Sequence, residues 1–251
     1  SLIDQSEAVH IILENYDDFM PFMSEQYSIN PKISVVESFI PFFNRLRDEL
    51  VDIDKVDQFI LKDFYKDDAE SLDQLNDLLR IFPIYQNLKK ENNLIDYNDM
   101  ILDTFHALKN DTRLLEKVQS KYEHLIIDEF QDNNYALNEI SRLISKKNRS
   151  ITVVGDDDQV IYSFRGANAF NISTFEKTYE SHPDYKMITL ETNYRSSQPI
   201  LDLANSSIKH NKERKVKSLV SAGKNIEIKP IIFKGEKPEQ IEFIANEIIK
   251  L

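Results

Sequence analysis

The segment from Leu125 to Asp132 reads Leu-Ile-Ile-Asp-Glu-Phe-Gln-Asp, and it decides the fold class. Its apolar run, which ends in two adjacent acids, is typical of a buried strand that leads into a polar loop. Two more runs of this kind occur at 150–155 and 185–190, and a helical pattern at 136–144 lies between the first two. Because such strands alternate with helices, the sequence predicts an α/β fold with βαβ units and a parallel sheet.

This acidic segment is the first candidate site, because ligands of parallel sheets bind beyond the carboxyl ends of the strands. Asp128 lies at such an end, and its carboxylate can hold Mg²⁺, a hard cation that prefers oxygen ligands. Glu129 can orient and deprotonate a water molecule, as phosphoryl transfer to water requires. The purely structural alternative is a strand followed by an acidic first helical turn, where carboxylates favour the helix dipole.

A second candidate stretch runs from 153 to 167 and reads Val-Val-Gly-Asp-Asp-Asp-Gln-Val-Ile-Tyr-Ser-Phe-Arg-Gly-Ala. Three acids lead to Gln159, a neutral group that can contact a terminal phosphate. Tyr162 and Phe164 then precede Arg165, and aromatic side chains beside an arginine suit base stacking on single strands. The alternative is an acidic loop that leads into a partly buried aromatic segment.

The third candidate stretch, 190–197, reads Leu-Glu-Thr-Asn-Tyr-Arg-Ser-Ser. An arginine fixed at a strand-to-helix turn, here Arg195, can stabilise charge on a transferring phosphoryl group. Tyr194 beside it could stack on a base. The alternative is a helix start that is capped by Ser196 or Ser197 and leaves Arg195 on the surface.

The remaining segments carry structural signals only. Residues 1 to about 95 have apolar residues at helical spacing and no chemical motif, so we predict helices there. We expect the prolines at positions 21, 31, 41 and 83 to start or break these helices. Further along the chain, 198–208 and 238–249 predict amphipathic helices, and 226–233 predicts a strand.

Composition limits the function further. The net charge is −12, and residues 1–120 carry all of it, with 24 acidic and 12 basic residues. Because such a surface does not attract phosphate backbones, any contact with a nucleic acid must come from a local groove. Cysteine is absent, which excludes disulfides and thiolate sites, and the four glycines are too dispersed for a phosphate-binding loop. Without a membrane-length apolar run or a signal-peptide pattern, we expect a cytoplasmic protein.

Taken together, the three stretches resemble the UvrD/Rep/PcrA-like DNA helicases of superfamily 1. Residues 128–132 resemble motif II of that family, 155–167 motif III and 190–197 motif IV. Weaker similarity extends to the family's Asp-Phe-Asp-Asp-Leu-Leu segment, its helical insertion and its second motor domain, at 96–101, 1–14 and 235–251. The resemblance implies an α/β fold with a partial RecA-like (P-loop NTPase) parallel sheet and an all-helical insertion domain.

The resemblance also implies an enzyme that uses ATP and Mg²⁺ and acts on single-stranded DNA or DNA duplex junctions. Asp128 would bind the Mg²⁺ of MgATP, and Glu129 would activate the attacking water. Gln159 would sense the γ-phosphate, Arg195 would act as an arginine finger, and Tyr194 would pack near the adenine.

On the DNA side, the resemblance implies that Tyr162 and Phe164 stack on bases, with Arg165 nearby. Phe164 stands where many family members have Trp, so it keeps an aromatic face of smaller area. Gln131 and Asp132 would link the nucleotide site to the DNA side.

Several family motifs do not occur in these 251 residues, namely the Gly-rich phosphate loop, the adenine-reading Gln motif and motifs V and VI. We therefore expect an internal portion of a larger helicase, which would not hydrolyse ATP alone. It would comprise a helical 1B-like insertion at 1–95, the C-terminal half of RecA-like domain 1A at 96–190, and the start of domain 2A at 191–251.

Two other functions stay open at this point. The chain could be a non-catalytic module derived from a helicase that binds single-stranded DNA or a protein partner. It could also be a carboxylate-metal nuclease or phosphatase that uses Asp128, Asp156, Asp157 and Asp158. The second interpretation leaves Gln159, Tyr194 and Arg195 without a role.

Overall fold

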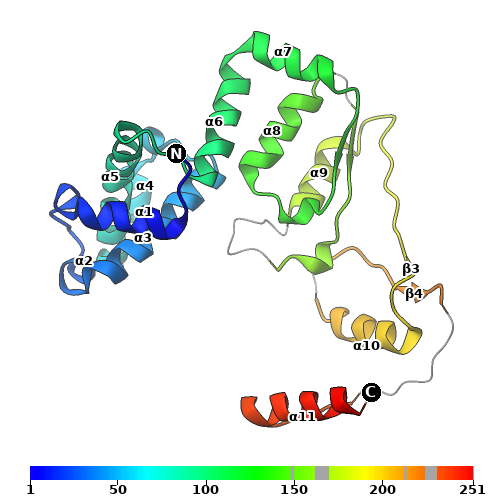
Figure 1. Cartoon of the computed structure of the whole chain (residues 1–251). Coiled ribbons are helices and arrows are strands. Elements are labelled where there is room, and N and C mark those ends of the chain that lie inside the picture. Colours follow the sequence, from blue (N-terminus) through cyan, green and yellow to red (C-terminus); the bar gives the residue numbers. More distant parts are fainter. Residues whose placement is uncertain (148–149, 162–169, 212–213, 224–230, 251) are drawn as a thin grey trace. The chain divides into compact units, whose positions relative to one another are not determined.

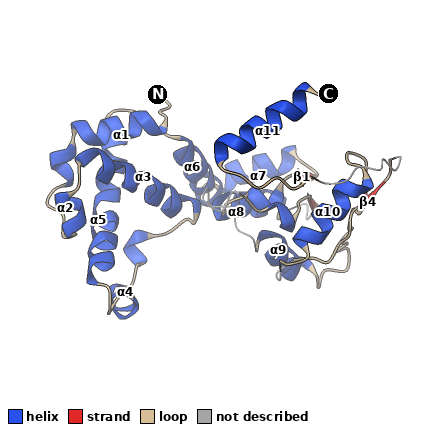
Figure 2. Cartoon of the chain, turned by 90° about the horizontal axis from the view of Figure 1, so that it is seen from below, coloured by secondary structure: helices blue, strands red, loops and turns tan. Residues whose placement is uncertain are grey.

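The computed structural model describes residues 1–147, 150–161, 170–211, 214–223 and 231–250. The chain forms two compact units, Ser1–Thr178 and Tyr179–Leu251, and each is described here by itself. Helices make up most of the regular structure in both (Figures 1 and 2). Within the described residues no helix is long and apolar enough to cross a membrane.

The first unit opens with a block of packed helices, which we call the helical block (residues 1–95). Its helices are α1 (Gln5–Glu14), α2 (Glu25–Ile29), α3 (Lys32–Asp48), α4 (Gln58–Phe64) and α5 (Ala69–Glu91), with 3₁₀ turns at Tyr16–Phe19 and Ile53–Lys55. The start of α1 is fixed by a capping box in which Asp4 and Glu7 exchange side-chain and backbone hydrogen bonds.

The core of the helical block is aromatic. Phe43 is completely buried, and its ring stacks on that of Tyr85 with centroids 5.1 Å apart. The rings of Phe39 and Phe82 lie 6.0 and 5.3 Å from the Phe43 ring, so α3 and α5 are joined by ring contacts along their facing sides. Such buried aromatic pairs stabilise beyond the area that they remove from water.

Two prolines differ from the sequence prediction. Pro31 is the N-cap of α3 as expected, but Pro41 and Pro83 lie inside α3 and α5 and do not end them. A proline in a helix loses one backbone hydrogen bond and crowds the preceding turn. Here buried side chains before and after each proline pack into the same core, and this burial offsets the lost bond.

The rest of the first unit is of α/β type. Its elements are α6 (Tyr97–Asn110), α7 (Thr112–Lys121), β1 (Leu125–Ile127), a 3₁₀ turn (Phe130–Asp132), α8 (Tyr135–Ser145), β2 (Ile151–Val153), a 3₁₀ turn (Asp157–Gln159) and α9 (Asn171–Tyr179). Strands β1 and β2 are parallel, and Ile126 lies opposite Thr152. The parallel pair predicted for the first two apolar runs is therefore confirmed, with α8 as its crossover helix.

The second unit contains β3 (Thr192–Asn193), α10 (Gln198–Ile208), β4 (Val220–Ser221) and α11 (Lys237–Ile249). Strands β3 and β4 are parallel, and the two helices agree with the predicted ones. The predicted strand at 185–190 is wrong: these residues form no strand, and Ile188 and Leu190 are exposed and find no partner strand in the described chain. Most of the strand predicted at 226–233 lies outside the described residues, and 231–233 form no strand.

The described residues thus form a helix-rich α/β fold with two two-stranded parallel sheets, in agreement with the predicted α/β class. A complete RecA-like sheet is not present in this part of the chain.

Candidate functional site

The acidic loop (residues 128–132) follows β1 and carries the first candidate residues. Asp128 and Glu129 are both exposed, and the Asp128 carboxylate accepts a hydrogen bond from the Glu129 N–H at 2.9 Å. Glu129 has a left-handed backbone (φ 50°, ψ 41°), which is uncommon for a residue other than glycine. This conformation turns the chain sharply at the end of the strand, as at many functional sites where surrounding contacts hold local strain.

Backbone hydrogen bonds to Val154, just past β2, flank Glu129 in the acidic loop. The Val154 N–H donates to the Ile127 carbonyl at 2.8 Å, and the Phe130 N–H donates to the Val154 carbonyl at 2.9 Å. The parallel ladder therefore continues past the regular strands and brings the two candidate stretches together.

Gln131 joins these two stretches through its side chain, which is 2% exposed. Its Nε2 donates to Glu129 Oε2 at 2.8 Å, and its Oε1 accepts from the Asp156 N–H at 3.0 Å. A Cβ at position 155 would lie 2.7 Å from Gln131 Oε1, so a side chain there would force the Gln131 amide to shift. The amide of Gln131 thus connects the Glu129 carboxylate to the backbone of the second stretch.

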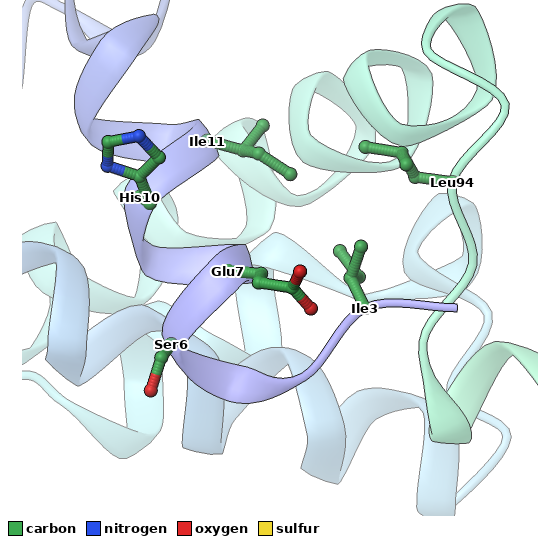
Figure 3. A pocket seen from close by; sticks show the side chains of 6 residues that line it. All are labelled: Ile3, Ser6, Glu7, His10, Ile11 and Leu94. Atoms are coloured by element: carbon green, nitrogen blue, oxygen red, sulfur yellow. The ribbon is translucent and has the colours of Figure 1, made fainter. Parts of the chain in front are cut away.

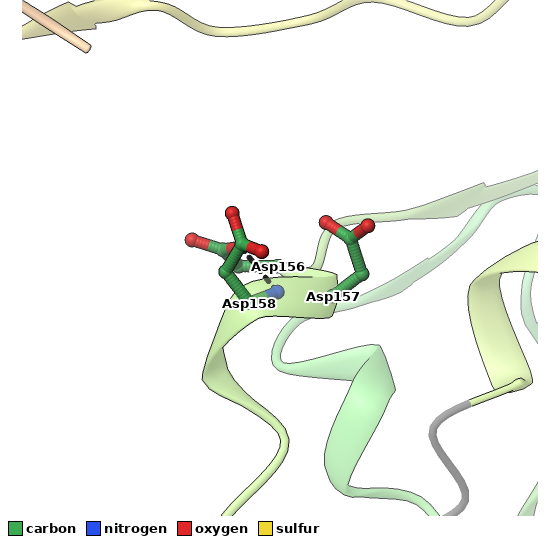
Figure 4. Close-up of side chains that lie close together, drawn as sticks. All are labelled: Asp156, Asp157 and Asp158. Atoms are coloured by element: carbon green, nitrogen blue, oxygen red, sulfur yellow. Dashed lines mark hydrogen bonds between the residues drawn. The ribbon is translucent and has the colours of Figure 1, made fainter. Parts of the chain in front are cut away.

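Asp156, Asp157 and Asp158 form an acidic group next to Gln159 (Figure 4). One carboxylate oxygen from each lies within 4.8 Å of the others, a spacing that could hold a cation. Gln159 Nε2 donates to Asp156 Oδ2 at 2.7 Å, so the Gln159 side chain is held beside this group. Among the described residues Asp128 is not part of the group, although the nuclease interpretation would use it there.

Asparagine side chains, which the sequence reasoning missed, surround the downstream end of the acidic loop. Asn171, buried at the start of α9, donates to the Asn133 carbonyl at 2.6 Å and accepts from Asn138 Nδ2 at 2.9 Å. Asn134 is the N-cap of α8, and its side chain accepts from the Leu137 N–H. The pair Asn133-Asn134 after an acidic segment could have indicated a turn and a helix cap, but no sequence signal pointed to Asn171.

Asp132 closes the acidic loop with an unusual feature. Its Oδ1 is buried and has no hydrogen-bond donor among the described residues. A buried carboxylate oxygen without a donor costs free energy.

The segment 96–101 lies at the start of α6, where its two aspartates are buried. Arg47 Nη1 lies 2.7 Å from both Asp96 Oδ1 and Asp99 Oδ1, and Lys89 Nζ lies 2.8 Å from Asp96 Oδ2. Burial alone would raise the pKa of Asp96, but Arg47 and Lys89 lower it to about 2. This buried ion cluster joins α3, α5 and α6.

In the second unit, Asn193 Oδ1 accepts from the backbone N–H groups of Arg195 and Ser196 at 2.9 and 2.7 Å. This turn places Tyr194, which is 86% exposed, and Arg195 on the surface. Ser197 is the N-cap of α10, as the structural alternative predicted, but its hydroxyl makes no capping bond.

Of the other predicted residues, Tyr162, Phe164 and Arg165 lie outside the described residues. The structure brings together Glu129, Gln131 and the backbone of Asp156, as the preceding contacts show.

Comparison with known proteins gives the family. Residues 1–180 match the UvrD/REP helicase N-terminal domain, and residues 188–251 match the UvrD-like helicase C-terminal domain. The chain belongs to the UvrD/REP helicase family. Its similar proteins include the ATP-dependent DNA helicases PcrA of Staphylococcus aureus, 38% identical over 170 residues, and of Staphylococcus epidermidis, 36% identical over 170 residues. Each alignment covers 68% of this chain but 23% of the relative, so it spans less than a quarter of the relative's length.

An open pocket of about 460 Å³ lies on the helical block of this UvrD/REP-family chain (Figure 3). Its wall is mostly apolar, and the Glu7 carboxylate at its edge is already bonded to the Asp4 N–H. The lining residues are Ile3, Ser6, Glu7, His10, Ile11 and Leu94. None of these belongs to the three candidate stretches, so the pocket is separate from the acidic loop.

Proposed function

We propose that this chain supplies part of the ATP-hydrolysing and DNA-contacting machinery of an ATP-dependent DNA helicase that translocates on single-stranded DNA. The observation that carries the proposal is the Gln131 amide, which connects the exposed Glu129 carboxylate to the backbone of Asp156. A helicase must couple hydrolysis to movement on DNA, and this contact joins the candidate hydrolytic loop to the stretch that leads to the candidate DNA residues.

On the nucleotide side, we propose that Asp128 holds Mg²⁺, because its exposed carboxylate follows the strand end and offers the oxygen ligand that this ion prefers. When bound, the ion would neutralise charge that develops on the phosphates. Glu129 would take the proton of the attacking water, and Gln159 and Arg195 would contact the γ-phosphate. Tyr194 would pack near the adenine.

On the DNA side, we propose that Tyr162 and Phe164 stack on bases and that Arg165 lies near the backbone, at single strands or duplex junctions. Gln131 and Asp132 would connect the two sides. The Asp132 oxygen supports this role, because it can accept a hydrogen bond and has no donor among the described residues.

The regional assignment of the chain is also a proposal. Residues 1–95 would form a 1B-like insertion, 96–190 the C-terminal half of RecA-like domain 1A, and 191–251 the start of domain 2A. The four glycines include no phosphate-binding cluster, so we expect no ATP turnover from these 251 residues alone.

Substitution of the candidate base tests the proposal. In a full-length helicase that carries these residues, Glu129→Gln should keep ATP binding and lower turnover by a factor of about 100 or more, because the general base is lost. Glu123→Gln is the matched control, since this exposed glutamate precedes the same strand at its other end. Turnover that survives Glu129→Gln would refute the assignment of Glu129 as the base.

The isolated chain gives a second measurement. We expect it to hydrolyse no ATP with Mg²⁺, either with or without single-stranded DNA. DNA binding without turnover in the full-length protein would instead favour the non-catalytic binding module. DNA-stimulated turnover by the 251 residues would show that a phosphate site exists without a glycine-rich loop.

A further inference from the structure

Asp48 is placed at an electrostatically unfavourable position. It is the last residue of α3 and is 7% exposed. A carboxylate at a helix C-terminus faces the negative end of the helix dipole, and burial removes it from water. Burial accordingly raises the pKa of the Asp48 carboxyl. The neighbouring Arg47 guanidinium is engaged with Asp96 and Asp99, so it does not form an ion pair with Asp48.

Two amide groups from other helices donate hydrogen bonds to the Asp48 carboxylate. Asn98 Nδ2 of α6 and Asn134 Nδ2 at the start of α8 both donate to Asp48 Oδ1, at 2.9 and 2.6 Å. Asn134 uses both ends of its amide, because its oxygen accepts from the Leu137 N–H at 2.9 Å and so caps α8. The carboxylate therefore ties the end of α3 to the first turn of α8.

The hydrogen bond between Asp48 and Asn134 fixes the chain next to the acidic loop. Asn134 lies two residues after Asp132, on the downstream side of a loop whose Ile127 and Phe130 are bonded to Val154, just past β2. Glu129, in between, holds a left-handed backbone, and such strain persists only where neighbouring contacts fix the chain on both sides.

We propose that Asp48 is a positioning residue that holds the downstream end of the acidic loop, through Asn134, against the helical block. It touches none of the groups assigned to catalysis. The proposal rests on the proposed function only in that Glu129 is the base; the effect of Asp48 on the loop can be measured without ATP or DNA.

Hydrogen exchange of the 251-residue chain tests the proposal, because the Phe130 and Val154 amides form the backbone bonds that flank Glu129 and report local opening of the loop. Asn134→Ser keeps an oxygen that can cap α8 and replaces the amide donor to Asp48 by a hydroxyl that is one bond shorter, so exchange at both amides should accelerate by about fivefold. Asn98→Ala is the matched control, because it removes the other donor to the same oxygen without touching α8; exchange should stay within about threefold.

A swap of the two side chains separates positioning from general loss of stability. Asn134→Asp keeps the cap but sets two carboxylates against each other, so exchange should accelerate by about tenfold. The double variant D48N/N134D restores an amide–carboxylate pair in the opposite order, and exchange should return to within about threefold of the original rate.

Three results would overturn the proposal: no change in Asn134→Ser, equal acceleration in Asn98→Ala, or a folded D48N/N134D variant that still exchanges fast. If the double variant does not fold, the comparison of Asn134→Ser with Asn98→Ala decides. None of these results involves ATP, so they leave the assignment of Glu129 untouched. Conversely, turnover that survives Glu129→Gln would leave the tie between Asp48 and the loop in place.

Discussion

The helical block and the acidic loop belong to the same compact unit, but their buried polar groups are satisfied to different degrees. In the helical block the core rings are fully packed, and the buried charges of Arg47 and Lys89 are matched by carboxylates. In the acidic loop, the buried Asp132 oxygen has no hydrogen-bond donor among the described residues. A left-handed backbone occurs in both regions, at Glu129 in the loop and at Leu50 and Asn93 in the helical block.

The difference indicates that the helical block serves mainly stability and the acidic loop mainly function. A chain that was selected only for stability would satisfy the Asp132 oxygen. Departures of this kind are typical of functional sites, where groups must stay available to a ligand at some cost in stability. We expect the helical block to supply most of the free energy of unfolding of the first unit.

The largest effect is expected from Phe43→Ala. Phe43 is completely buried and contacts three other rings, so its truncation should lower the free energy of unfolding by about 3–5 kcal/mol. Urea denaturation followed by circular dichroism measures this change. Ile126→Ala, on the exposed side of β1, is the control and should cost far less. Equal losses in the two variants would break the comparison.

An intermediate effect is expected from acid. The pKa of Asp96 is lowered from 3.8 to about 2 in the folded chain, so its stabilising contribution is complete above the unfolded pKa and is lost as the pH falls through the folded one. Between pH 5 and pH 2 the free energy of unfolding should therefore fall by about 2 kcal/mol more than in Asp96→Asn.

Denaturation of both proteins at a series of pH values provides the measurement. Asparagine also caps helices well, so the variant keeps the start of α6. Parallel pH profiles for the two proteins would show that the buried ion cluster does not stabilise the helical block in this way.

The smallest effect is expected beside the acidic loop, for Gly155→Ala. The added methyl group would lie 2.7 Å from Gln131 Oε1 and 3.2 Å from Ile172 Cδ1, so we expect a loss of about 1–2 kcal/mol from overpacking. Gly223→Ala meets no atom closer than 3.5 Å and should be close to neutral. If Gly155→Ala were also neutral, the close contact between Gln131 and the second stretch would not constrain the loop.

Local patterns carried most of what the sequence predicted. The apolar runs before Asp128 and Gly155 gave β1 and β2, because burial and alternation with α8 are visible in adjacent residues. The run at 185–190 is also rich in apolar residues but has no partner strand in the described chain, and a strand needs a neighbour to satisfy its backbone. Composition alone could not distinguish the two cases.

For the candidate site too, the sequence predicted residues within one motif but not the contacts between distant residues. Asp128, Glu129 and Gln131 were chosen from one short stretch, and the contact of Gln131 with the second stretch became visible in the structure. The roles of Asp48 and Asn171 depend on contacts with residues that are 86 and 38 positions away in the sequence. Single polar residues far from any motif carry no periodic signal that would predict such contacts.

The buried ion cluster has a consequence for protein engineering. Its two bases lie before position 95 and its two acids after it, so a graft that exchanged residues 1–95 between relatives would separate charges that now neutralise one another. Uncompensated buried charges are among the most destabilising outcomes of a substitution. The boundary of the exchanged segment should therefore lie after Asp99. It should lie after Asn134 if Asp48 and Asn134 are to come from the same relative. The segments that can be exchanged in this chain are thus determined by which residues share the buried ion cluster and not by where the helices end.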